Sequence, residues 1–388
     1  MSWLSASIAN QKECLEGLEL TRGDLRQKVE AAIVNSRGQT SNSLEVAAGI
    51  MGGQRQKTSD VGLFSESAST MQRMFKLGAN LIVAKDGSGH VGSIQEAVNL
   101  VVDESLGPTF IYVKEGIYEE NVVVEETKWN VYMIGDGMYS SIITGNRSST
   151  DPEGYITSWT ATLFVSGQGF VAIDMGFRNT AGPEHFQAVA AFSSSDRSIF
   201  FRCSFDAYQD TLYAHSNRQF YRDCDIIGTI DFIFGDAAAV FQRCNILPRE
   251  PLPFQYNTIT AQGKEQPAEN TGFSIHECII RPYEVVTRPT YLSRPWRNYS
   301  TVVVMKTEMS SVVDPAGWVP WEGSVPPDTI NFAEIENTGP GADISGRVSW
   351  PGCRPAISEA EASMYTVGAF INGAEWIPLA GVPFDPNF

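Results

Sequence analysis

Several features on which common protein classes depend are scarce or missing in this sequence. No segment approaches 18 consecutive apolar residues, so no membrane-spanning helix is predicted. Lys and Arg number 28 against 45 Asp and Glu, and the net charge is −17. This balance disfavours nucleic acids and anionic membranes as partners, because either would favour a basic face. The first residues, Met1 to Glu16, show neither the basic stretch nor the apolar core of an export signal.

The motifs of several enzyme classes are also missing. No Gly-x-Ser-x-Gly elbow occurs, which disfavours a serine hydrolase. The four histidines have no metal-ligand spacing, so we predict no metal site; they are His90, His185, His215 and His276. Gly167-Gln168-Gly169 is too short for a nucleotide-binding loop and predicts a turn. We therefore expect no cofactor.

What the sequence does contain is a repeat of about 21 residues. Aromatic segments that end in Arg and Cys recur as Phe200-Phe201-Arg202-Cys203, Phe220-Tyr221-Arg222-Asp223-Cys224 and Phe241-Gln242-Arg243-Cys244. Their cysteines are spaced 21 and then 20 residues apart. A fixed period of this length, with short apolar runs and no helical pattern, predicts an all-β solenoid: a parallel β-helix in which one turn is one repeat.

Three parts are predicted along the chain. Residues 1–50 carry partial helical stripes and are expected to form part of a helical bundle; residues 51–78 are rich in Gly, Ser and Gln and read as a linker; residues 79–388 form the β-helix. Period-two segments predict strands at residues 81–84, 110–113, 131–134, 161–177, 199–205, 230–234, 273–280 and 301–305. A helix near residues 93–101 is expected to cap the N-terminal end of the solenoid.

Polar residues follow the same repeat. Gln187, Gln209 and Asp231 are each 22 positions apart. In a parallel β-helix, residues one period apart stack about 4.8 Å apart, so these side chains and Asp210 converge on one patch. For a single position, a ladder of mutually hydrogen-bonded polar side chains is an adequate explanation. Two carboxylates and two amides on adjacent turns, among aromatic residues, favour a functional site.

The residue types in this patch suit hydrolysis. Asp210 and Asp231, brought close together, cannot both ionise freely, so one is expected to keep its proton near neutral pH. A neutral acid beside an ionised carboxylate is equipped to donate a proton and to attack or activate water. Arg294 is the candidate cation that holds the ionised partner. Gln187 and Gln209 offer amide donors for a developing oxyanion.

The cysteines and two short motifs bear on the cellular setting. Disulfides between adjacent coils are predicted for Cys203 with Cys224 and for Cys244 with Cys278; buried free thiols are the alternative. Asn146-Arg147-Ser148 and Asn298-Tyr299-Ser300 match the glycosylation acceptor pattern. Together these features indicate an oxidising, secretory setting.

Residues 81–388 resemble the plant pectin methylesterases. The resemblance lies in five blocks: Gly116-Ile117-Tyr118-Glu119-Glu120, Gln187-Ala188-Val189-Ala190, Tyr208-Gln209-Asp210-Thr211-Leu212-Tyr213, Asp231-Phe232-Ile233-Phe234-Gly235 and Leu292-Ser293-Arg294-Pro295-Trp296. Members of that family are right-handed parallel β-helix enzymes that hydrolyse the methyl esters of galacturonan. The resemblance implies an extracellular, monomeric enzyme of the plant cell wall that acts on methyl-esterified homogalacturonan and binds a proteinaceous inhibitor.

The resemblance also implies residue roles. Asp231 would be the nucleophile, and Asp210 the acid that protonates methanol and then the base that activates water. Gln209 with Gln187 would stabilise the oxyanion, and Arg294 would orient Asp231. Residues expected to contact substrate or line the groove are Thr157, Gln187, Arg294, Trp296, Trp318 and Trp321. A neutral ester also suits an acidic enzyme better than the polyanionic product does.

Two departures from the family pattern are expected to weaken activity or alter site preference. Ala191-Phe192 stands where the family usually has Leu-Arg, and Ser293 replaces a usual Gly. A side chain at 293 would shift Arg294 if the backbone there needs a positive φ. The alternative function is therefore a non-catalytic or weakly active pectin-binding wall protein. A pectin-cleaving lyase or glycosidase is less favoured, because the acidic Ca²⁺ cluster of a lyase is not evident.

Residues 1–50 resemble the C-terminal portion of the inhibitor-like pro-region that precedes many of these enzymes. Trp3-Leu4-Ser5-Ala6 through Cys14 and Thr40-Ser41-Asn42-Ser43-Leu44 carry this likeness. The basic processing site expected between the two regions is degraded to Gln72-Arg73-Met74-Phe75.

Overall fold

A computed structural model describes residues 6–7, 9–11, 73 and 75–388 of the chain. Residues 6–7 and 9–11 are helical, and so are residues 73 and 75–77. The predicted partial bundle over residues 1–50, its Cys14 and the linker over residues 51–78 otherwise lie outside the described residues. Among the helices that the structure describes, none is both long enough and apolar enough to cross a membrane.

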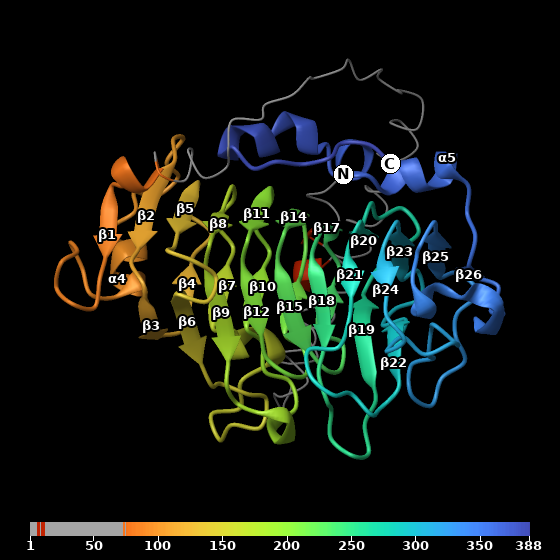
Figure 1. The fold of residues 1–388 in the computed structure, drawn as a ribbon. Helices are drawn as coiled ribbons and strands as arrows, with labels where there is room; N and C mark the ends of the chain where they lie inside the picture. The colour runs from red at the N-terminus through yellow and green to blue at the C-terminus, as the bar shows by residue number, and fades with distance from the viewer. Residues whose placement is uncertain (1–5, 8, 12–72, 74) are drawn as a thin grey trace, which may run out of the picture.

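Parallel strands from Leu81 onward form three sheets in the described part of the chain (Figure 1). The first sheet contains β1 (Leu81–Val83), β2 (Thr109–Val113), β5 (Val131–Ile134), β8 (Val171–Ile173), β11 (Ser198–Phe201), β14 (Arg218–Arg222), β17 (Ala238–Gln242), β20 (Gly272–His276), β23 (Thr301–Met305), β25 (Asn331–Ile335) and β26 (Cys353–Arg354). The second contains β4 (Val122–Val124), β7 (Leu163–Val165), β10 (Ala191–Ser193), β13 (Leu212–Ala214), β16 (Ile233–Gly235), β19 (Asn257–Gln262) and β22 (Thr290–Ser293). The third contains β3 (Gly116–Glu119), β6 (Ser141–Gly145), β9 (Gly176–Asn179), β12 (Ser204–Asp206), β15 (Asp225–Gly228), β18 (Asn245–Pro248), β21 (Ile279–Ile280) and β24 (Glu308–Met309).

Each full coil takes one strand from each sheet, in the order first, third, second. The repeat found in the sequence sets the register, because Phe200 pairs with Tyr221, and Tyr221 pairs with Phe241. These rings stack inside the solenoid, with centroids 5.0 Å and 4.6 Å apart. The predicted parallel β-helix is therefore confirmed, and its interior is a column of stacked side chains.

The four predicted disulfide cysteines also stack inside the solenoid, but as thiols. Cys203, Cys224, Cys244 and Cys278 are buried and free. Each Sγ donates to main-chain carbonyls; Cys224 Sγ, for example, lies 3.3 Å from the carbonyl oxygens of Phe200 and Arg222. The prediction of Cys203–Cys224 and Cys244–Cys278 disulfides was wrong. Equivalent side chains of a parallel stack point the same way and lie about 4.8 Å apart. A disulfide needs two Cβ atoms that approach to about 4 Å.

Short helices close the end and one side of the solenoid. Helix α4 (Ile94–Asn99) is capped by Ser93 and lies at the N-terminal end, as predicted, with Ile94, Ala97 and Val98 buried. The C-terminal segment contains α5 (Glu359–Ala362) and α6 (Val367–Phe370), and in Figure 1 it runs alongside the first sheet. The 3-10 helices are η1 (Thr157–Thr160), η2 (Pro183–His185), η3 (Pro340–Ala342), η4 (Ile344–Gly346), η5 (Ser363–Tyr365), η6 (Gly373–Glu375) and η7 (Ile377–Ala380).

The C-terminal segment buries the outer face of the first sheet. Val367, Ile371 and Ile377 are fully buried and share an apolar cluster with Phe220 and Val240 of β14 and β17. The outer face of the first sheet is therefore covered. The candidate catalytic residues lie next to the second sheet.

Candidate active site

The two candidate acids occupy equivalent positions on successive coils. Asp210 comes two residues before β13, and Asp231 two residues before β16. Leu212 pairs with Ile233, which lies 21 residues later in the chain, so Asp210 and Asp231 are neighbours on adjacent coils. Both adopt the left-handed conformation, with φ values of 64° and 51°, and both are largely buried. This conformation is uncommon outside glycine and often marks functional positions.

Arg294 binds Asp231 through two parallel hydrogen bonds. Its Nε lies 2.8 Å from Oδ1 and its Nη2 lies 2.5 Å from Oδ2. Such two-point pairs fix the plane of the carboxylate as well as its charge. Burial alone lowers the pKa of Arg294, but the charge of Asp231 and these hydrogen bonds outweigh it and raise that pKa. Arg294 is therefore a permanent cation at this place.

Ser293, the residue before Arg294, does not disturb this ion pair. It ends strand β22 and does not have a positive φ. Its hydroxyl donates to the Thr260 carbonyl at 3.0 Å, and the Arg294 amide donates to the same oxygen at 3.1 Å. The condition under which Ser293 would displace Arg294 is therefore not met.

The surroundings of Asp210 favour its protonated form, in contrast to those of Asp231. Burial first, and the negative charge of Asp231 second, raise the pKa of Asp210 well above its ordinary value, and Arg294 only partly opposes them. A carboxyl group in this setting keeps its proton at a pH where free Asp is ionised. The direction agrees with the prediction that one member of the pair stays neutral.

The two glutamines lie on successive coils, and Gln209 directly precedes Asp210. Gln187 and Gln209 form a parallel bridge, so the 22-residue spacing does bring them together. Ser149, from the turn after β6, donates its hydroxyl to Gln187 Oε1 at 2.8 Å. Because the amide oxygen accepts this bond, the amide nitrogen of Gln187 is the end that remains for an anionic oxygen.

Two residues that contact this group were not predicted from the sequence. Ser149 is one of them, and it lies outside the repeat. Thr258 of β19 is the other: its hydroxyl donates to Asp231 Oδ1 at 2.6 Å and accepts from the Asp231 amide at 2.8 Å. Thr258 follows Asp231 by 27 residues, because the loop before β19 lengthens this coil. A search with a period near 21 could not find it.

An aromatic row continues from the acids along the second sheet. Parallel rings stack at 4.9 Å for Trp159 with Phe164, at 4.2 Å for Phe164 with Phe192, and at 4.1 Å for Tyr213 with Phe234. Phe192 meets Tyr213 edge-on at 5.1 Å, which joins the two stacks. Phe192 is 3% exposed, so the residue that departs from the family pattern is a packing element of this row.

The predicted substrate contacts fall into two groups. Trp296 is half-buried at the end of the aromatic row, 6.1 Å from Phe234, and Thr157 begins helix η1 just before Trp159. Trp321 covers the site, since the Arg294 guanidinium lies 4.1 Å from its ring centroid. Trp318 is only 1% exposed and stacks on Phe332 at 4.8 Å inside the solenoid. The prediction that Trp318 lines the groove was wrong, because its side chain points into the core.

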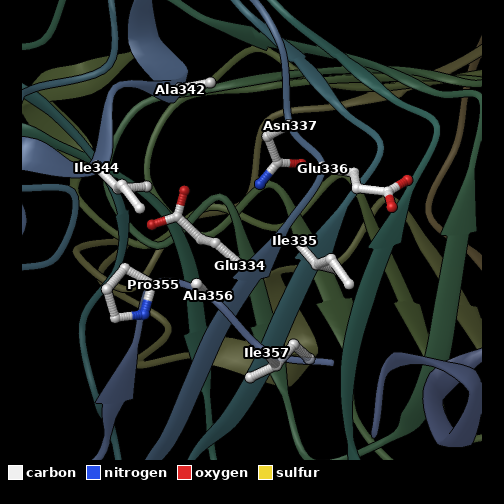
Figure 2. A pocket seen from close by; sticks show the side chains of 9 residues that line it. All are labelled: Glu334, Ile335, Glu336, Asn337, Ala342, Ile344, Pro355, Ala356 and Ile357. Atoms are coloured by element: carbon white, nitrogen blue, oxygen red, sulfur yellow. The ribbon is translucent and has the colours of Figure 1, made fainter. Parts of the chain in front are cut away.

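A separate hollow of about 220 Å³ lies between β25 and the C-terminal segment (Figure 2). Glu334 is among the residues that line it, and this carboxylate is already paired with Arg347, whose Nε lies 2.7 Å from Oε1. None of the predicted site residues lines this hollow.

Comparisons with known proteins agree with this geometry. The family model described as Pectinesterase matches residues 80–374. The chain is 48% identical over 402 residues to "Pectinesterase 3" of Phaseolus vulgaris, covering 99% of this chain and 69% of that protein. It is 45% identical over 405 residues to "Probable pectinesterase/pectinesterase inhibitor 46" of Arabidopsis thaliana, covering 100% of this chain and 72% of that protein.

Solved structures give the same result. The structure of pectin methylesterase from carrot superposes with a TM-score of 0.77 at 42% identity, covering 86% of this chain and all of that one. The deglycosylated pectin methylesterase from Aspergillus niger superposes with a TM-score of 0.66 at 28% identity, covering 77% of this chain and 95% of that one. With the parallel β-helix, the acid pair and these matches taken together, the chain belongs to the pectinesterase family of carboxylic ester hydrolases.

Proposed function

We propose that this protein hydrolyses the methyl esters of galacturonan in pectin and releases methanol, with Asp231 as the nucleophile. The proposal rests on the different environments of two adjacent carboxyl groups, those of Asp231 and Asp210. Asp231 is held by Nε and Nη2 of the partly buried Arg294, while burial and the charge of Asp231 raise the pKa of Asp210. One group is thus equipped to attack as an anion and the other to donate a proton.

The first half-reaction forms an acyl-enzyme. A carboxylate oxygen of Asp231 attacks the ester carbonyl carbon, and the carbonyl electron pair moves onto its oxygen. The amide nitrogens of Gln187 and Gln209 donate to this oxyanion; one such donor is worth on the order of 10²–10³ in rate. Collapse of the intermediate breaks the bond to the methoxy oxygen, which takes the proton of Asp210 and departs as methanol.

The second half-reaction returns the enzyme to its starting state. Asp210, now ionised, accepts a proton from a water molecule, and the resulting hydroxide attacks the carbonyl carbon of the substrate. The bond to Asp231 breaks, which frees its carboxylate and leaves a galacturonate carboxyl group. Arg294 stays charged throughout and receives the regenerated carboxylate in its original geometry.

Substrate binding is proposed to follow the aromatic row. Tyr213 and Phe234 each come three residues after one of the acids, Trp296 lies next to both rings, and Trp159, 48% exposed, lies at the far end of the row. Sugar rings and uncharged methyl esters suit such flat apolar surfaces. Thr157, the first residue of η1, is proposed as a polar contact next to Trp159.

The setting and partners follow from the family. We propose that the protein acts as a monomer in the plant cell wall on methyl-esterified homogalacturonan, and that a proteinaceous inhibitor of the kind named in its Arabidopsis relative binds it. Residues 1–50 are proposed as an inhibitor-like region, residues 51–78 as a linker and residues 79–388 as the catalytic domain. The non-catalytic alternative is not favoured, because neither Phe192 nor Ser293 breaks the Arg294–Asp231 pair.

Methanol release tests the proposal directly. The full chain is incubated with highly esterified pectin, and methanol and new carboxyl groups are measured. We expect equal amounts of both from the wild type and none above background from Asp231→Ala. Turnover by Asp231→Ala, or binding to pectin without methanol release by the wild type, would exclude the proposed function.

A further inference from the structure

The hydroxyl group of Thr258 bridges two parts of the same aspartate. Thr258 is fully buried in β19, one coil beyond Asp231. Its Oγ1 accepts from the main-chain N–H of Asp231 at 2.8 Å and donates to Asp231 Oδ1 at 2.6 Å. One side chain therefore fixes both the left-handed backbone of Asp231 and the rotation of its carboxylate.

Main-chain hydrogen bonds hold Thr258 itself in place. Its amide donates to the Thr229 carbonyl at 3.2 Å, and its carbonyl accepts from the Phe232 amide at 3.3 Å. These two residues lie on either side of Asp231 in the chain. The main chain of Thr258 is thus tied to the turn that carries the carboxylate, which keeps its side chain next to Asp231.

The contacts divide unequally between the two carboxylate oxygens. Oδ1 accepts from Thr258 Oγ1 and from Arg294 Nε, whereas Oδ2 accepts from Arg294 Nη2 alone among the described contacts. A carboxylate oxygen has room for about two strong hydrogen bonds in its plane. Oδ1 is fully engaged, and Oδ2 keeps a lone pair with which to attack.

We propose that Thr258 is a positioning residue that commits Oδ1 of Asp231 to holding the group in place and leaves Oδ2 as the attacking oxygen. This assignment rests on the proposed function. It names the atom that forms the bond to the ester carbon; that bond breaks again when water attacks, so no further reactant is required. Thr258 itself touches no reacting atom.

The test compares Thr258→Val with a matched control. Valine keeps the shape of threonine and removes the hydroxyl. The control is Thr271→Val, because the Thr271 hydroxyl likewise donates to a buried carboxylate, Asp236 Oδ1, at 2.6 Å. Both variants lose a buried hydroxyl-to-Asp hydrogen bond; Thr258→Val also loses the bond from the Asp231 amide and is expected to lose more stability, and only Thr258 contacts the proposed nucleophile.

Methanol release from esterified pectin is measured for both variants and for Thr258→Ser, with kcat and KM determined separately across pH. For Thr258→Val we expect kcat to fall on the order of 10²-fold, as for other small misplacements of a reacting group, with KM within about twofold. Thr258→Ser should recover kcat to within about threefold, and Thr271→Val should keep the wild-type kcat and pH profile.

Three outcomes would overturn the assignment: an unchanged kcat in Thr258→Val, no recovery in Thr258→Ser, or an equal loss in Thr271→Val. If Thr258→Val does not fold, Thr258→Ala takes its place in the same comparison. Failure of the proposed function looks different, because the wild type would then release no methanol at all, and the assignment of Thr258 would fall with it.

Discussion

The guanidinium group of Arg294 lies between Trp321, whose ring centroid is 4.1 Å away, and the carboxylate of Asp231. The indole lies over the cation, whose side chain is 12% exposed, while Nε and Nη2 bind the two carboxylate oxygens. A cation that is shielded in this way interacts more strongly with its partner than a solvated one does.

Arg294→Lys should lower kcat on the order of 10²-fold, since lysine keeps the charge but offers no planar fork to fix the carboxylate. KM should change much less. The control is Arg243→Lys, which alters the arginine that directly follows β17; its side chain is 49% exposed and pairs with Glu277. Steady-state methanol release decides the matter, and an Arg294→Lys enzyme within threefold of the wild type would contradict the role given to the fork.

Asp210→Asn should remove activity and yet raise the melting temperature at neutral pH. Burial and the charge of Asp231 raise the pKa of Asp210 in the folded protein, so the folded state binds this proton more tightly than the unfolded chain does. The resulting stability is complete below the ordinary value of 3.8 and is lost as pH rises through the raised pKa. Asparagine does not ionise, so Asp210→Asn does not lose this stability as the pH rises.

Thermal unfolding of wild type and Asp210→Asn at pH 4 and pH 7 measures this difference. The gain in melting temperature should be larger at pH 7, and a gain that is equal at both pH values would count against a raised pKa. In the wild type, kcat/KM should fall on the alkaline side as Asp210 loses the proton that methanol needs.

Gln187→Ala should lower kcat by 10²–10³-fold if the amide stabilises the oxyanion, an order of magnitude typical for one such donor. Ser149→Ala should cause a smaller loss, about tenfold, because the amide keeps its nitrogen but loses the hydrogen bond that orients it. Ser194, whose hydroxyl bonds to Ser166 on another coil, provides the control as Ser194→Ala. Equal rates for Ser149→Ala and wild type would mean that the orienting bond has no effect on turnover.

Reducing agents should leave the melting temperature unchanged, because the stacked cysteines are thiols. A thiol reagent should label Cys203, Cys224, Cys244 and Cys278 only after denaturation, since all four are buried in the native protein. Mass spectrometry of the labelled peptides makes the count. Labelling that requires prior reduction would restore the disulfide prediction.

Trp318→Ala and Trp321→Ala should separate stability from function. Trp318 fills the interior, and its truncation should cost about 3–5 kcal/mol of unfolding free energy. Trp321 covers Arg294, so its truncation should lower kcat/KM with a much smaller effect on stability. Urea unfolding and methanol release are measured on the same samples, and a stable Trp318→Ala with impaired pectin binding would reverse the assignment.

The sequence was sufficient to predict those parts of the site that follow the repeat. A period near 21 leads directly to Phe200, Tyr221 and Phe241 in the core, and to Asp210 beside Asp231 at its edge. Arg294 was predicted because the ionised carboxylate needs a cation nearby. Each of these predictions used only spacing or charge, and both quantities can be read without coordinates.

Other features depend on direction and distance, which spacing does not contain. Trp318 and Trp321 are three residues apart in the same aromatic loop, and only the structure shows that one faces the core and the other the site. The cysteines are in register, as predicted, but equal register makes their side chains parallel and leaves them unbonded. Thr258 was hidden because its coil is longer than its neighbours.

The residues of the candidate site come from six successive turns of the chain, which carry Ser149, Gln187, Gln209, Asp231, Thr258 and Arg294 in that order. A solenoid readily gains or loses a whole turn during evolution, since each new turn finds ready-made neighbours above and below. Within this stretch the number of turns cannot change, because an extra turn between Asp231 and Arg294 would separate the two side chains. Duplications and deletions should therefore accumulate towards the two ends of the molecule, and its middle should keep a constant number of turns.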